Sequence, residues 1–464
     1  MKHICLEPWQ SHPLSYANTS IRLFEYDGTL LRGISATYES QVRELFKKGI
    51  VDTLVNRDLL VQTEISEYSS DEYPLILKHE RIPTITYPVE WPPEALRAAG
   101  MAVLDLQEAL LNYKQLLGDI NPWNILFRGT QPVFVDFGSL VWGAAATIEQ
   151  FVHEFHSYYI WPLQLAGKGL WRYVVYLVGD FNRALQYEDV LLLLGPRELA
   201  RPATSTGIVD KYLRRFRAGA KRGRASRGNA TDLRLTIDNL RASLSGLKLP
   251  KKESQSTCAK FPMDRQTFDQ SNDWNQKQLS VKQILEEVSP RSLLDMCSSD
   301  SWYSVLAGSM GIRVVSSDGV PEMMNEFYLT ACNYEGDIYP IVMDFCDPTP
   351  ARGVANSWFK PATQRFRSDM VMCLAAIPRL VFGSQLSFDQ IVGGLAAFSE
   401  KWLLVEFIPR EDNMVGQYGE ARQHHWYTEP SFVRALEYRF RIRRTYLSFP
   451  ATRKLFLCER NGAA

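Results

Sequence analysis

The second half of the chain alternates short apolar runs with helical segments, and this alternation constrains the fold more than any other feature. Five apolar runs of strand length follow one another, at 291–296, 312–318, 338–343, 370–374 and 402–407. Short buried strands joined by helices predict a parallel sheet that is covered on both faces. We therefore expect an α/β fold with a doubly wound sheet over residues 276–464.

Acidic residues stand where three of these runs end. Asp295 lies in the tail of the first run, Asp318 ends the second, and Asp344 follows the third. In an open parallel sheet, ligands bind beyond the carboxyl ends of the strands, near the switch in strand order. A carboxylate after the second strand can accept hydrogen bonds from two ribose hydroxyls, and one after the third from an adenine amino group. The alternative is that each acid caps a turn or helix after its strand.

The order and spacing of these segments resemble the class I S-adenosylmethionine (SAM) dependent methyltransferases. Segment 292–296 resembles the first motif of the family, 314–318 its ribose-binding strand, and 341–345 its adenine contact. Segments 368–375 and 402–409 resemble the fourth and fifth strands, so that the likeness spans roughly residues 274–458. The resemblance implies a Rossmann-like methyltransferase domain with SAM as its cofactor. The cofactor-binding residues that it implies are Asp295, Ser298, Asp318, Asp344 and Ala375.

The first loop departs from the pattern of the family. The family has glycines there, which let the backbone approach the methionine part of the cofactor. This chain has Met-Cys-Ser-Ser-Asp-Ser over 296–301, with no glycine. Serines are small and can still form hydrogen bonds, although a positive φ costs them more free energy. A fold that is retained without its cofactor is therefore the alternative.

Methyl transfer depends on positioning and on the exclusion of water more than on an acid–base pair. The acceptor pocket is expected around residues 375–379, just past the fourth strand. His424 and His425 could act as the base that deprotonates an acceptor, with His424 as the catalytic candidate, and a polar pair on the surface is the other interpretation of these two histidines.

A second constellation lies in the first part of the chain. Asp119 is followed by Asn124 five residues later, and by Asp136-Phe137-Gly138 after a short hairpin. This pattern resembles the catalytic and metal loops of protein kinases and aminoglycoside phosphotransferases. The resemblance implies that Asp119 orients an attacking hydroxyl, while Asn124 and Asp136 hold magnesium on the phosphates of ATP. We therefore expect an α+β kinase-like domain over residues 1–200.

The upstream half matches kinases less well. A kinase needs a flexible glycine-rich loop and a strand lysine. Here Asp27-Gly28 predicts a tight hairpin, and Arg32 stands on the strand where the lysine is expected. Lys78, on a later strand, is the alternative cation. The other interpretation of the constellation is that Asp119 and Asn124 cap a turn and that Asp136 forms a pair inside the domain.

Residues 201–275 differ in character from both regions. Eight lysines and arginines fall within 211–227 without one acid, and the polar stretch 251–257 has the composition of a linker. We expect a basic helical or flexible connector. Contact of the basic run with an anionic substrate or nucleic acid is the less favoured alternative.

The chain totals limit the class of protein. The formal net charge is +0, so nothing global attracts the chain to nucleic acid or to an anionic membrane. The seven cysteines include no C-x-x-C pair, which argues against a disulfide framework and a zinc knuckle. No window is long and apolar enough for a membrane span, and the start lacks the apolar core of a signal peptide. We expect a cytoplasmic protein with a small-molecule substrate and no membrane contact.

The whole chain resembles bacterial proteins that combine a kinase-like region with a methyltransferase domain, a group that includes a host-specific nodulation protein of rhizobia. This resemblance implies SAM-dependent methyl transfer to a small-molecule or carbohydrate-like metabolite. The kinase-like lobe would then present the substrate or regulate the site. Two alternatives stay open, which are a phosphotransferase that uses magnesium and ATP at the N-terminal site, and a non-catalytic assembly protein in which both sites have decayed.

Overall fold

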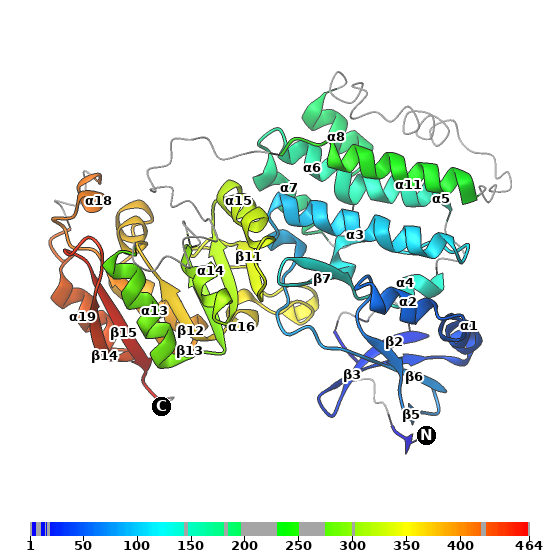
Figure 1. Ribbon diagram of the computed structural model, residues 1–464, viewed down its shortest axis with the longest axis horizontal. Coiled ribbons are helices and arrows are strands. Elements are labelled where there is room, and N and C mark those ends of the chain that lie inside the picture. Colours follow the sequence, from blue (N-terminus) through cyan, green and yellow to red (C-terminus); the bar gives the residue numbers. More distant parts are fainter. Residues whose placement is uncertain are drawn as a thin grey trace. The chain divides into compact units, whose positions relative to one another are not determined.

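The computed structural model describes residues 2–5, 11–13, 15, 19–142, 147–180, 184–195, 230–249, 274–298, 302–418 and 424–462. The chain forms two compact units (Figure 1). The first contains Met1–Pro250 and the segment Gly353–Phe359, which holds the short helix η7 (Val354–Asn356). The second contains Lys251–Arg352 and Lys360–Ala464. The basic run 211–227 and the polar stretch 251–257 lie outside the described residues.

The first unit begins with an antiparallel sheet in the order β2-β3-β6-β4. Its strands are β2 (Ile21–Tyr26), β3 (Thr29–Ile34), β6 (Leu75–His79) and β4 (Thr63–Ile65), and β1 (Lys2–His3) pairs separately with β5 (Tyr68–Ser69). The predicted hairpin is confirmed, because β2 pairs with β3 around Asp27 and Gly28. Both turn residues have positive φ, 47° and 70°, as a tight two-residue hairpin turn requires.

Helices follow this sheet. The pair α1 (Ala36–Lys47) and α2 (Ile50–Asn56) is separated by Gly49, whose left-handed φ of 66° ends the first helix. A short turn η2 (Pro88–Glu90) leads into α3 (Pro93–Leu111), which begins with proline at its first position and buries most of its apolar side chains. The turn η3 (Pro122–Asn124) and the hairpin of β7 (Ile125–Arg128) and β8 (Gln131–Phe134) follow.

The remaining helices of the first unit form its helical part. They are α4 (Gly138–Trp142), α5 (Ile148–Phe155), η5 (His156–Ile160), α6 (Trp161–Ala166), α7 (Trp171–Val178), α8 (Tyr187–Leu194) and α11 (Ala230–Ser245). Helix α11 packs along α3, and Arg241 donates to both Asp105 and Glu108 of that helix. Among the described residues, no helix combines the length and the apolar character that crossing a membrane requires.

A seven-stranded sheet forms the second unit, in the order β11-β10-β9-β12-β13-β15-β14. The strands are β9 (Ser292–Met296), β10 (Arg313–Asp318), β11 (Ile338–Val342), β12 (Ser368–Cys373), β13 (Ser399–Phe407), β14 (Phe440–Leu447) and β15 (Lys454–Arg460). The first five are parallel, and β15 runs antiparallel to both of its neighbours. The predicted α/β fold with a doubly wound sheet is therefore present. The last two strands, of which only β15 runs against the others, were not predicted.

One helix precedes the first strand of this sheet, and others follow or connect its strands. They are α13 (Gln276–Val288), α14 (Trp302–Ser309), α15 (Pro321–Ala331), α16 (Ala362–Arg365), η8 (Arg379–Gly383), α17 (Phe388–Phe398), α18 (Asn413–Gly416) and α19 (Glu429–Glu437). The chain moves outward from β9 to β11 in one direction and from β12 to β13 in the other. Right-handed crossovers then place α14 and α17 on opposite faces. The strand order reverses between β9 and β12, and this switch is where a doubly wound sheet leaves a crevice.

Candidate functional site

Strained backbone marks the carboxyl ends of the two strands that flank the switch. Cys297 directly follows β9 with φ 61°, and Ala375 follows β12 with φ 56°. Residues other than glycine rarely adopt this left-handed conformation, because the Cβ atom then crowds the backbone. Such strain gathers at ligand sites, where the surrounding structure enforces it. The loops after β9 and β12 are therefore the first place to look for a site.

The three predicted acids lie on neighbouring strands at this edge of the sheet. Asp295 is buried and accepts a hydrogen bond from Ser304 Oγ of α14 at 2.6 Å. Asp318 is buried as the last residue of β10, whereas Asp344 is exposed. A Cβ atom added at Gly319 would lie 3.3 Å from Cβ of Asp344, so the ends of β10 and β11 are in close proximity. The structure thus brings the acids at 318 and 344 together and turns Asp295 toward α14.

An arginine engages the central acid of this group. Asp318 Oδ2 accepts from Arg379 Nη2 at 3.2 Å, and Oδ1 accepts from the backbone N–H of Val320 at 3.0 Å. Burial alone would lower the pKa of Arg379, but the Asp318 carboxylate and the Cys297 thiol raise it above its ordinary value. Sequence reasoning missed this pair, although Arg379 closes the segment 375–379 that was predicted to border the acceptor.

Ser298 is the last described residue of the glycine-less loop before the gap at 299–301. Its backbone N–H donates to Ser317 O at 2.9 Å, which ties the loop to β10. The Ser298 side chain is buried, and its hydroxyl has no partner within the described part of the chain. A buried hydroxyl without a hydrogen bond costs about 1–3 kcal/mol, so a polar ligand group at this point would be stabilising. Residues 299–301 of the loop lie outside the described residues.

A buried carboxylate supports the loop after β12. Glu406, inside β13, is fully buried and accepts from Lys277 Nζ at 2.7 Å, from Ala375 N at 2.8 Å and from the Ser448 hydroxyl. The hydrogen bond from Ala375 N to Glu406 holds the backbone of Ala375 in its left-handed conformation. Sequence reasoning missed Glu406, although a charged residue inside an otherwise apolar strand is the signal that could have found it.

His424 lies in an aromatic cluster rather than on an open polar surface. Its ring centroid is 5.4 Å from that of Phe382 in η8 and 5.5 Å from that of Trp426. Phe382 also packs on Tyr427 and Tyr418. Because η8 begins at Arg379, this cluster borders the segment that was predicted to face the acceptor.

These residues fit an adenosine-containing cofactor in part. The unpartnered Ser298 hydroxyl and the exposed Asp344 beside Gly319 suit such a ligand. Asp318 also suits it, but only if ribose hydroxyls replace the Arg379 guanidinium. The capping contacts that the alternative predicts are present too, since Asp318 and Asp344 accept from the backbone N–H groups of Val320 and Cys346.

The first unit contains a separate cavity of about 220 Å³. Its walls come from the β2-β3-β6-β4 sheet, from the segment that leads to η2, and from the β7–β8 hairpin. The polar side chains among its lining residues include Arg32, His79, Asn124 and Asp136. Asp119 lies beside them, and burial raises its pKa, with the charge of Asp136 adding to the shift. The structure therefore gathers the three residues of the kinase-like prediction.

The Asp136 carboxylate is already engaged by protein donors. Oδ1 accepts from Arg32 Nη1 at 3.1 Å and from Gly138 N at 3.2 Å. Oδ2 accepts from Ser139 N at 3.1 Å and from Ser139 Oγ at 2.7 Å. Asp136 thus pairs with Arg32 inside the unit, which is the arrangement that the alternative interpretation predicts for it, and it also caps α4. Lys78 does not take the place of Arg32, because it pairs with Glu64 on an exposed surface.

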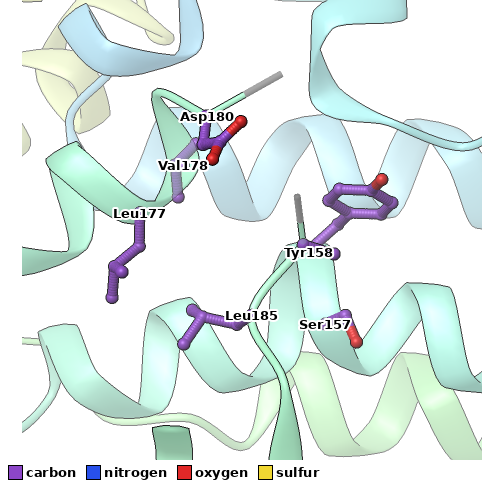
Figure 2. Close-up of a pocket in the computed structure, with 7 residues that line it drawn as sticks. Ser157, Tyr158, Leu177, Val178, Asp180 and Leu185 are labelled. Atoms are coloured by element: carbon purple, nitrogen blue, oxygen red, sulfur yellow. The ribbon is translucent and has the colours of Figure 1, made fainter. Parts of the chain in front are cut away.

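A much smaller cavity of about 10 Å³ lies in the helical part of the first unit, and Figure 2 shows Tyr158 and Asp180 among its lining residues. This volume is about the least that can hold one water molecule. Asn121 Nδ2 donates to the Tyr158 hydroxyl at 3.4 Å, which links this region to the loop of Asp119. Burial raises the pKa of nearby Glu154 to about 7, and the charge of Asp119 adds to the shift.

Known proteins resemble this chain over part of its length or over almost all of it. No protein-family model matches the chain. Among solved structures it resembles methyltransferases at low identity. Magnesium protoporphyrin IX methyltransferase from Synechocystis PCC 6803 with bound SAM is 16% identical, with 40% of this chain and 79% of that chain covered and a TM-score of 0.28. The N-methyltransferase NodS from Bradyrhizobium japonicum WM9 is 10% identical, with a TM-score of 0.28. The match covers 39% of this chain and 96% of the NodS chain.

One curated relative spans almost the whole chain. The chain is 23% identical over 473 residues to the nodulation protein NoeA of Rhizobium meliloti (strain 1021). This match covers 96% of the chain and 95% of that protein. The kinase-like character of the first unit stays a prediction.

Proposed function

We propose that the second unit binds SAM and transfers its methyl group to a small-molecule or carbohydrate-like metabolite. The observation that carries the proposal is the Asp318 carboxylate, which ends β10 beside the switch in strand order with an unpartnered Ser298 hydroxyl on the neighbouring loop. Ligands of doubly wound sheets bind at this place.

Each residue has a distinct task in this proposal. SAM supplies an activated methyl group on a sulfonium. Asp318 accepts from the ribose hydroxyls after Arg379 has moved, Asp344 accepts from the adenine amino group, and Ser298 contacts the methionine part. The carbonyl group and the turn of Ala375 form one edge of the crevice. Glu406 fixes this turn by accepting a hydrogen bond from Ala375 N. Asp295 acts through α14, since its carboxylate holds Ser304.

The acceptor side is proposed to lie at η8 and the aromatic cluster around His424. The packed rings of Phe382, Tyr427 and His424 would exclude water there, and exclusion and positioning are what methyl transfer needs. His424 is the candidate base for an acceptor whose proton must be removed. The first unit would present the acceptor or regulate the reaction, and the name of the relative suggests a signal or metabolite of nodulation as its context.

Photo-cross-linking tests the site directly. Ultraviolet irradiation of the full chain with methyl-labelled SAM, followed by peptide mapping, should label peptides that contain the ends of β9, β10 or β11. Asp318→Ala should remove the label, and the matched control Asp389→Ala, an exposed acid in the first turn of α17, should keep it. Label confined to the first unit, or equal label in Asp318→Ala, would refute the site.

The phosphotransferase alternative places magnesium on Asn124 and Asp136 and the substrate hydroxyl on Asp119. The three side chains do lie together, but Asp136 already accepts four hydrogen bonds from the protein. Magnesium would have to displace Arg32 and open the cap of α4, so we do not propose magnesium–ATP chemistry here. A non-catalytic assembly protein with both sites decayed would show no label at all in the same experiment.

A further inference from the structure

An arginine cluster, formed by Arg367, Arg439 and Arg460, lies at the end of the second unit's sheet that is opposite the crevice. Arg367 directly precedes β12, and Arg460 ends β15, where that antiparallel strand reaches the start of β13. Arg439 directly precedes β14, whose first residue pairs with Arg460. The cluster is therefore at the amino ends of the parallel strands, whereas the crevice is at their carboxyl ends.

The carboxyl end of α17 holds two of these side chains near each other. Arg460 Nη1 donates to Ala396 O at 2.6 Å and also to Ser399 O, the first carbonyl after the helix. A Cβ atom added at Gly393, about one turn earlier, would lie 3.7 Å from both Nε and Nη2 of Arg439. Both guanidinium groups thus lie along the last turns of the same helix.

Arg367 reaches the same place from the neighbouring strand. It precedes Ser368, which pairs in register with Ser399, and the Ser399 carbonyl accepts from Arg460. Burial lowers the pKa of Arg460, and the positive charges of Arg367 and Arg439 lower it further. Like charges at close range destabilise one another, so an anion between them would be stabilising.

No carboxylate pairs with the arginine cluster in the part of the chain that the structure describes. Glu459, the residue before Arg460, is bonded to Arg443, and Asp369, two residues after Arg367, is bonded to Arg291. The two carbonyl oxygens use both hydrogens of Arg460 Nη1, but its Nε and Nη2 have no partner among the described residues. One edge of a fixed guanidinium therefore remains available for a ligand.

We propose that the arginine cluster binds a diphosphate group, either free or as part of an ester. A guanidinium matches phosphate geometry and forms strong charge-assisted hydrogen bonds with it. The three guanidinium groups carry a charge of about +3, which a diphosphate of about −3 balances and a single phosphate of about −2 does not. Arg460, held by the end of α17, fixes the ligand, and the exposed Arg367 and Arg439 close on it. The site is independent of the proposed methyl transfer, since it lies at the other end of the sheet.

Calorimetric titration of the full chain with pyrophosphate in EDTA tests the proposal. We expect one site per chain, and orthophosphate and sulfate should bind at least about tenfold more weakly because each carries less charge. Methyl diphosphate distinguishes the two sources of the group. If it competes with pyrophosphate, the ligand is an ester, and if it does not, the ligand is free diphosphate. No binding of pyrophosphate, or equal affinity for orthophosphate, would overturn the proposal.

Three variants separate the arginine cluster from a general attraction of anions. Arg367→Gln and Arg439→Gln change exposed side chains, and each should weaken pyrophosphate binding at least about fivefold. Arg441→Gln is the matched control, because it removes the same charge from an exposed position of β14 opposite Glu459. It should bind within about twofold of the unmodified chain. Unchanged affinity in the first two variants, or an equal loss in Arg441→Gln, would overturn the proposal.

Discussion

An arginine engages the acid at the centre of the site in both units, but the two arginines are held very differently. Arg379 reaches Asp318 at 3.2 Å, and its side chain is 40% exposed. Arg32 reaches Asp136 at 3.1 Å, but its side chain is 8% exposed and is also bonded to His79. Exposed ion pairs contribute about 0–1 kcal/mol, whereas loss of one partner from a buried pair costs about 3–5 kcal/mol. We infer that the first pair can be exchanged for a ligand and that the second is permanent.

The largest expected effect is a loss of stability in the second unit when Glu406, which supports the loop after β12, is substituted. Glu406→Ala would leave Lys277 buried without its partner and would release Ala375 N, so it should destabilise the unit by about 3–5 kcal/mol. Urea denaturation followed by tryptophan fluorescence measures the change. Glu406→Gln, which loses the charge but keeps an acceptor for Ala375, should lose less, and equal losses in both variants would show that the contact with Ala375 N contributes nothing.

The two arginines can be compared directly by the same substitution. Arg32→Ala should destabilise the first unit by about 2–3 kcal/mol, somewhat below the usual cost because Asp136 keeps its other donors. Arg379→Ala should destabilise the second unit by about 1 kcal/mol, the upper end for an exposed pair, because it leaves behind the fully buried Asp318 carboxylate. Denaturation midpoints of both variants check the difference. If the two variants lose the same free energy, the contrast between an exchangeable pair and a permanent pair is wrong.

If ribose hydroxyls replace the Arg379 guanidinium at Asp318, removal of Arg379 should change the affinity for SAM. Arg379→Ala removes the guanidinium that the ribose must displace, so SAM should bind up to about fivefold more tightly, which corresponds to about 1 kcal/mol. Competition binding with labelled SAM measures the ratio. Weaker binding would instead mean that Arg379 contacts the cofactor, and the pair would then not be exchanged for the ribose.

A smaller effect concerns the acids of the first unit. Burial raises the pKa of Glu154 from 4.5 to about 7, with the charge of Asp119 adding to it. The folded state therefore holds this proton more tightly than the unfolded state, and stability should fall as the pH rises from 4.5 to 7. Glu154→Gln should flatten this part of the dependence of melting temperature on pH, whereas Glu149→Gln on the same helix should not. An unchanged slope in Glu154→Gln would place the titrating group elsewhere.

The parallel strands could be predicted because each is buried and therefore apolar along its length. The predicted 291–296 and the observed β9 (Ser292–Met296) differ by one residue, and the acids at the strand ends followed from the pattern. Strand β14 was missed because it lies at the edge of the sheet and carries exposed arginines, so it lacks an apolar run. Alternation in such an edge strand is too irregular to identify it from sequence.

The partners of the site acids could not be predicted in the same way. Arg32 and Asp136 are 104 residues apart in the sequence, and Asp318 and Arg379 are 61 apart. No local pattern reports such pairs, because they form only when the elements pack. The sequence could therefore identify the acids, but it could not show whether each acid faces a ligand or a neighbouring cation.

The most direct test of the central claim is calorimetric titration of the full chain with SAM. We expect one site per chain and a loss of about 100-fold in affinity in Asp318→Ala, since charge-assisted hydrogen bonds contribute roughly 1.5–3 kcal/mol each. Asp389→Ala should bind like the unmodified chain. No binding of SAM by the unmodified chain, or undiminished binding by Asp318→Ala, would contradict the assignment of the crevice at the switch between β9 and β12.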